Sequence, residues 1–159
     1  MFVFKNIVDV VEVAVRIERQ GIQLYNSLSA TVRSPKAKDA FSMLAADEEK
    51  HAGIFRAMLE KIADYTPRYT YPGEYGLFID DMASGILEKA KRKAKASAGN
   101  ITKALDLGIG LEKETILFYS ELASDKRLGK THKEILGKVI AEERTHWKTL
   151  VALKNKLKV

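Results

Sequence analysis

The sequence contains no cysteine, and this absence removes several classes of site at once. Disulfide bonds, a cysteine-ligated zinc or iron–sulfur centre and a cysteine nucleophile are all excluded. Any metal that the chain binds must therefore be held by nitrogen and oxygen ligands.

Long apolar runs are also missing, since no apolar stretch approaches 18 residues. The first residues lack the basic region and apolar core of a signal peptide. We therefore expect no membrane span, no membrane partner and a cytoplasmic location. The net charge of +6 is spread over scattered lysines, which indicates solubility rather than nucleic-acid binding.

Proline is scarce, with three residues in 159, and two of them fall within residues 65–75. The remaining sequence is free to form long helices, in which apolar residues recur at alternating steps of three and four. Ser34-Pro35 and Asn100 are expected helix starts, and Gly129-Lys130-Thr131 marks a turn and cap. The pattern predicts four helices, over about Ile7–Ala30, Pro35–Asp64, Ile101–Ser124 and residues 132–156.

Residues 65–99 separate the second helix from the third, and they read as one long crossover with one or two short helical segments. A connection of this length is typical of a ferritin-like bundle, in which the chain travels the bundle length between two hairpins. We therefore predict an all-α fold: an antiparallel four-helix bundle in one domain over residues 1–159, with hairpins at 7–64 and 100–156.

Two Glu-x-x-His motifs stand on the core-facing positions of the second and fourth helices. Glu48 and His51, and likewise Glu143 and His146, are three residues apart, so each pair lies on one helix face. Glu18 and Glu112 occupy core-facing positions of the first and third helices. A Glu-x-x-His pair from each of two helices and one glutamate from each of two others form the ligand set of a dinuclear carboxylate site.

The two halves of the chain resemble each other around these residues. Residues 17–25 (IERQGIQLY) align with 111–119 (LEKETILFY), and the two Glu-x-x-His pairs fall at nearly the same offset. The sequence therefore predicts a duplicated hairpin with an approximate twofold axis through the site.

Four carboxylates in a helical core need compensating charge, because each costs several kcal/mol if it is left unpaired. No Lys or Arg occupies a core-facing position from which it could neutralise them. Two divalent cations would balance the four negative charges, and two neutral imidazoles would complete the coordination. Such an oxygen-rich set suits iron, or alternatively manganese, better than zinc. The alternative is a buried polar network that fixes helix register.

The other polar residues are expected to lie outside the site. His132 precedes Glu143 by eleven residues, about 16 Å along a helix, which is too far to join it. Glu49, Glu114 and Glu142 fall off the core-facing positions and are expected to be solvated. Glu142 is the competitor to Glu143, because it lies four residues before His146, but the matched spacing of the two motifs favours Glu143.

Small and aromatic residues follow the glutamates of the first and third helices. Gly21 and Thr115 come one turn later and would leave room for the cluster and a small oxidant. Tyr25 and Tyr119 come two turns later, and their hydroxyls either approach the metal ligands from behind or belong to ordinary core aromatics. Trp147 is expected to serve in packing.

The combined pattern Glu18…Tyr25, Glu48-x-x-His51, Glu112…Tyr119 and Glu143-x-x-His146 resembles the rubrerythrin family of the ferritin-like superfamily. The resemblance covers the four helices, most of the chain. It implies a di-iron oxidoreductase that reduces hydrogen peroxide or activates O2, as a homodimer or larger homo-oligomer.

The sequence departs from that family in two places. Rubrerythrins typically carry a cysteine-ligated iron domain, and the lack of cysteine implies that electrons come from a separate donor protein. Many rubrerythrins also have a further glutamate where this chain has Thr115. Three other functions remain open: a ferroxidase or iron-storage protein, an O2-dependent hydroxylase and a purely structural bundle.

Overall fold

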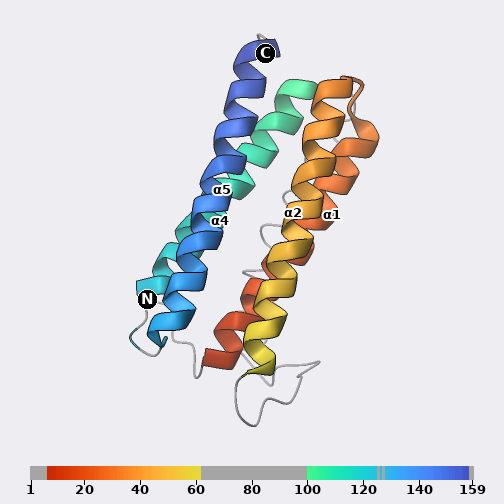
Figure 1. Cartoon of the computed structure of the whole chain (residues 1–159). Helices are drawn as coiled ribbons and strands as arrows, with labels where there is room; N and C mark the ends of the chain where they lie inside the picture. The colour runs from red at the N-terminus through yellow and green to blue at the C-terminus, as the bar shows by residue number, and fades with distance from the viewer. Residues whose placement is uncertain (1–6, 62–99, 125, 127, 158–159) are drawn as a thin grey trace, which may run out of the picture.

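The computed structural model describes residues 7–61, 100–124, 126 and 128–157, and they form four long helices. Helices α1 (Ile7–Thr31) and α2 (Pro35–Glu60) make one hairpin, and α4 (Ile101–Ser124) and α5 (Lys130–Leu157) make the other. The hairpins lie side by side in a bundle (Figure 1), which confirms the predicted all-α fold. The crossover predicted for 65–99 lies outside the described residues.

The helix starts follow local sequence signals. The Ser34 hydroxyl accepts a hydrogen bond from the Ala37 N–H at 3.4 Å, and Pro35 occupies the first turn. The Asn100 side chain accepts one from the Lys103 N–H at 3.0 Å. These caps satisfy amide groups that have no partner within their helix, which explains why both starts were predictable from sequence.

The end of α2 differs from the prediction. The helix stops at Glu60 rather than near Asp64, and residues 62–64 lie outside the described part of the chain. The Lys61 N–H donates to the Met58 carbonyl at 3.3 Å, which tightens the last turn. None of the described helices is sufficiently long and apolar to traverse a lipid bilayer.

The core consists of two apolar clusters at opposite ends of the bundle. One lies near the α1–α2 turn and contains Leu28, Phe41, Leu105 and Leu150, all fully buried. The other lies at the far end and contains Val11, Phe55, Leu122 and Leu136. Between them, the core-facing positions at mid-height of the bundle carry glutamate and histidine. The fold thus encloses a polar layer between two apolar ones.

Gly108 of α4 lies where the helices approach closely. A Cβ at this position would stand 2.9 Å from Leu150 Cδ1 and 3.3 Å from Tyr25 Cε1. At Gly110, two residues further along the same helix, a Cβ would meet no described atom within 4 Å. An alanine at Gly110 would therefore change helix propensity alone, whereas an alanine at Gly108 would also crowd the core.

We predict opposite effects of alanine at these two glycines. Gly110→Ala should raise the free energy of unfolding by up to about 1 kcal/mol, because alanine favours the helix. Gly108→Ala should lower it by about 1–2 kcal/mol, because overpacking outweighs that gain. Urea unfolding followed by circular dichroism measures both. Equal stability of the two variants would contradict this packing.

Candidate metal centre

Six side chains from the four helices meet at mid-height of the bundle. One glutamate comes from α1 and one from α4, and a Glu-x-x-His pair comes from each of α2 and α5. All six residues are buried, and none has more than 5% of its surface exposed. The residues that the structure brings together are Glu18, Glu48, His51, Glu112, Glu143 and His146.

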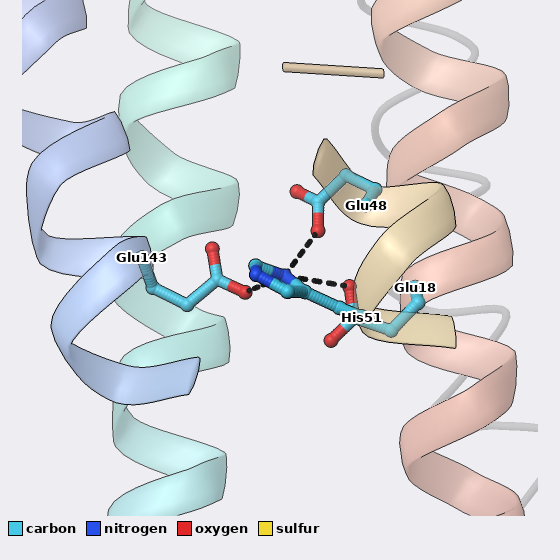
Figure 2. A group of neighbouring side chains, drawn as sticks. All are labelled: Glu18, Glu48, His51 and Glu143. Carbon is cyan, nitrogen blue, oxygen red and sulfur yellow. Dashed lines mark hydrogen bonds and ion pairs between the residues drawn. The ribbon is translucent and has the colours of Figure 1, made fainter. Parts of the chain in front are cut away.

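The first half of the centre is arranged around Nδ1 of His51 (Figure 2). This nitrogen lies 3.0 Å from Glu143 Oε1, 3.3 Å from Glu48 Oε2 and 3.8 Å from Glu18 Oε2. The three carboxylates come from three different helices and point toward the same imidazole. They offer a compact set of one nitrogen and three carboxylate ligands.

The second half repeats this arrangement around Nδ1 of His146. That nitrogen lies 3.2 Å from Glu143 Oε2 and 3.8 Å from Glu112 Oε2. Glu48 also belongs to this group, in which the potential ligand atoms all lie within 4.8 Å of one another. Glu48 and Glu143 are therefore shared by both halves, whereas Glu18 and Glu112 each belong to one half. This is the arrangement expected of two bridging and two terminal carboxylates.

The hydrogen bonding inside the centre is incomplete. Oε1 of Glu143 and Oε2 of Glu112 are buried, and neither has a hydrogen-bond partner among the described residues. Glu143 Oε1 lies 3.0 Å from His51 Nδ1, yet the two atoms are not aligned for a hydrogen bond. Lone pairs that converge without bonding one another fit a shared cation. We find that the residues present suit two metal ions.

The charges support the same fit. Among the described residues, the four glutamates form ion pairs with the two histidines and with no Lys or Arg. Four carboxylates balance two divalent cations, and the set of oxygen ligands with one imidazole per ion suits iron or manganese. The alternative considered from sequence is a buried polar network without metal. In such a network, protons would have to neutralise the four carboxylates.

In the metal-free protein, protons neutralise part of the negative charge of the carboxylates. Burial, together with the Glu143 carboxylate, raises the pKa of Glu112 to about 8. Burial disfavours charge on the imidazoles, but the adjoining carboxylates outweigh it and raise the pKa of His51 to about 9 and that of His146 to about 10. Burial opposes ionisation of Glu143 as well, yet its hydrogen bond with His146 and the neighbouring His51 imidazole lower its pKa to about 2.

The two tyrosines that follow the glutamates bond across the hairpins. The Tyr25 hydroxyl of α1 donates to Glu112 Oε1 of α4, and the Tyr119 hydroxyl of α4 donates to Glu18 Oε1 of α1. Burial, reinforced by the bonded carboxylate, raises the pKa of each phenol well above its ordinary value. Both hydroxyls therefore keep their protons and hold the terminal glutamates in place. Each tyrosine hydroxyl thus lies against a carboxylate of the cluster rather than among apolar side chains alone.

Two acidic residues that sequence reasoning did not assign to the site contact the outer nitrogens of the histidines. Glu142 Oε2 of α5 lies 2.9 Å from His51 Nε2 of α2. Asp47 Oδ2 of α2 lies 3.4 Å from His146 Nε2 of α5. Glu142 was expected to be solvated, and its side chain is indeed 57% exposed, but it also makes this contact. The signal that could have found both is an acidic residue directly before each Glu-x-x-His motif.

The remaining sequence candidates lie around the centre. A Cβ on Gly21 would stand 3.2 Å from Cγ and Cδ of Glu48, so the glycine makes room for that carboxylate. Thr115 is buried one turn after Glu112. Glu49 pairs with Arg56 at 3.0 Å, and Glu114 is exposed. His132 is half-buried and is not part of the cluster.

The chain is similar to known proteins in sequence and in fold. The crystal structure, at 2.30 Å resolution, of a candidate ferritin-like diiron-carboxylate protein from Thermotoga maritima superposes with a TM-score of 0.68 and 26% sequence identity, over 98% of both chains. No curated protein matches the sequence significantly. The family model named Rubrerythrin matches residues 9–154, which include all six clustered side chains. The chain therefore belongs to the rubrerythrin family.

Proposed function

We propose that this protein is a di-iron oxidoreductase that reduces hydrogen peroxide, or activates O2, with electrons from a separate donor protein. The observation that carries the proposal is the pair of buried Glu/His groups that share Glu48 and Glu143. Membership of the rubrerythrin family supports the reaction class. The absence of cysteine means that this chain has no cysteine-ligated cluster of its own from which electrons could be drawn.

The proposed ligands divide into two kinds by their surroundings. Glu48 and Glu143 would help to hold both iron ions, because they belong to both groups, while Glu18 and Glu112 would each help to hold one of them. His51 and His146 would bind through Nδ1, the nitrogen that faces the carboxylates. Two iron ions held there would supply one electron each to the oxidant.

Other residues of the chain orient these ligands and control protons. The Glu142 carboxylate would hold a proton on Nε2 of His51, and the Asp47 carboxylate would do the same for His146. Nδ1 of each histidine would then be free to bind metal. The Tyr25 and Tyr119 hydroxyls fix one oxygen of each terminal glutamate. The apolar clusters above and below exclude water from the layer between them, and so strengthen its electrostatic interactions.

Iron oxidation for storage is the second candidate. Thr115 stands where many rubrerythrins carry a further glutamate, so the ligand set is symmetric between the two halves. A symmetric centre of this kind also suits simple oxidation of ferrous ions. Storage requires a cage, and a particle the size of a dimer in a sedimentation experiment would exclude it.

The first prediction for this function concerns the reaction with peroxide. Protein loaded anaerobically with two equivalents of Fe(II) should react with one equivalent of peroxide and gain the near-ultraviolet absorption of an oxidised iron pair. Glu143→Gln should slow the reaction by at least about a hundredfold, because it removes a carboxylate that both Glu/His groups share. Glu114→Gln, on the exposed side of α4, is the matched control and should leave the rate unchanged. An iron-loaded wild type without any absorbance change would contradict the proposal.

The second prediction concerns pH. Glu112, His51 and His146 hold protons at pH 7 in the metal-free protein, because their pKa values are raised to about 8, 9 and 10. Metal must displace these protons, so its apparent affinity should increase as the pH rises from 6 to 7, by about tenfold for each proton released. Calorimetric titration with Mn(II) in two buffers of different ionisation enthalpy counts the protons. Affinity that is independent of pH would show that the site binds no metal through these groups.

The third prediction tests the carboxylates behind the histidines. Glu142→Ala and Asp47→Ala should each weaken Mn(II) binding by about 10–100-fold, because the imidazole loses the group that fixes its tautomer. Glu142→Gln should recover part of the affinity, since its amide oxygen can still accept the Nε2 proton. Glu49→Ala, which removes an equally exposed charge from α2, should have little effect. An unchanged affinity in Glu142→Ala would mean that the contact plays no part in metal binding.

A further inference from the structure

The outward face of α4 and α5 next to the metal centre carries four neighbouring side chains: Lys113, Arg144, Trp147 and Lys148. We propose that this face, called here the α4–α5 basic face, is the docking surface for a small acidic electron-carrier protein. The inference rests on the proposed function, because it locates the separate donor that the function requires.

The position of the face relative to the centre is the first argument. Lys113 follows Glu112 directly, and Trp147 follows His146 directly. The Lys113 ammonium lies 5.1 Å from the centre of the Trp147 ring, so the pair joins α4 to α5. Trp147 is half-buried. A carrier bound there would be separated from His146 by one aromatic side chain and one peptide unit.

The charge of the α4–α5 basic face also favours an acidic partner. Lys113, Arg144 and Lys148 are exposed, and among the described residues none of them forms an ion pair with a carboxylate. By contrast, Lys154 further along α5 is neutralised by Asp106 at 2.6 Å. Lys113 thus contacts the indole, and Arg144 and Lys148 lie within one helical turn of Trp147 on α5, on a chain whose net charge is +6. Such a surface attracts an acidic partner and accelerates its association.

The α4–α5 basic face also contains residue types that are common in protein interfaces. Tryptophan and arginine are the side chains that contribute most to protein interfaces. The Trp147 indole N–H is buried without a hydrogen-bond partner among the described residues. Leu117, one turn after Lys113 on α4, is 64% exposed. An apolar centre with a charged rim suits the small, transient interfaces of electron-transfer complexes.

The electron balance defines the carrier. Reduction of one hydrogen peroxide to two waters consumes two electrons and two protons. A one-electron carrier must therefore be oxidised twice per turnover and must leave between the two transfers. Weak, salt-sensitive binding to an exposed basic face meets this requirement, because rapid release is as necessary as rapid association.

The indole of Trp147 provides a direct test. It is the only tryptophan, so the 15N-labelled chain has a single indole N–H signal in a nuclear magnetic resonance spectrum. Titration with an acidic plant-type [2Fe–2S] ferredoxin at low ionic strength should shift or broaden this signal. Lys113→Glu with Lys148→Glu should weaken the binding by at least about tenfold. Lys36→Glu with Lys38→Glu changes the net charge equally at the start of α2 and should change the affinity by less than about twofold.

The outcomes distinguish this inference from the proposed function. An unperturbed indole signal, equal weakening by the two charge-reversal pairs, or an equal response to basic cytochrome c would overturn the docking surface. Tighter binding of a short single-stranded oligonucleotide to the same residues would also overturn it, in favour of nucleic acid. If ferredoxin binds as expected but iron-loaded protein consumes no peroxide, the docking surface stands and the peroxidase function fails. If the protein turns over peroxide with dithionite as reductant but ferredoxin does not bind at Trp147, the peroxidase function stands and the docking surface fails.

Discussion

The neutralisation of four buried glutamates is the constraint on which the rest of this structure depends. A carboxylate in the middle of a helical bundle is strongly unfavourable unless positive charge or protons accompany it. In the described structure no Lys or Arg pairs with these glutamates. Their negative charge is instead offset by protons, because the pKa values of Glu112 and His146 are raised. The polar layer is thus poised to exchange protons for cations, while the apolar clusters on either side provide the stability of the fold.

The approximate twofold symmetry explains how one hairpin positions the clustered side chains of the other. Tyr25 supports Glu112, and Tyr119 supports Glu18, from the opposite hairpin in each case. Glu142 contacts His51, and Asp47 contacts His146, again across the two hairpins. Each of these four contacts joins a residue of one hairpin to a residue of the other. The centre can therefore form only when the two hairpins are packed together, and this links the geometry of the site to the fold.

Much of this arrangement could be predicted from the sequence because helical periodicity is a strong local signal. The spacing of Glu48 and His51, repeated at Glu143 and His146, fixes which side chains share a face, and the caps at Ser34 and Asn100 fix two of the helix starts. The contacts of Asp47 and Glu142 were missed because they depend on the distance between α2 and α5. The acidic residue directly before each Glu-x-x-His motif is a signal for these contacts, but it does not encode that distance. The early end of α2 was missed for a similar reason, since no glycine or proline marks Lys61.

The metal content of the protein tests the central claim most directly. Chain purified without added metal, then loaded with Fe(II) and freed of excess, should contain two iron ions per chain by elemental analysis. Its thermal midpoint should rise on loading, because the ions bind the folded state. Replacement of Glu48 by alanine should reduce the content to fewer than one ion per chain. A folded wild-type chain that retains no iron, manganese or other divalent cation would contradict the account, since protons alone would then balance the four carboxylates.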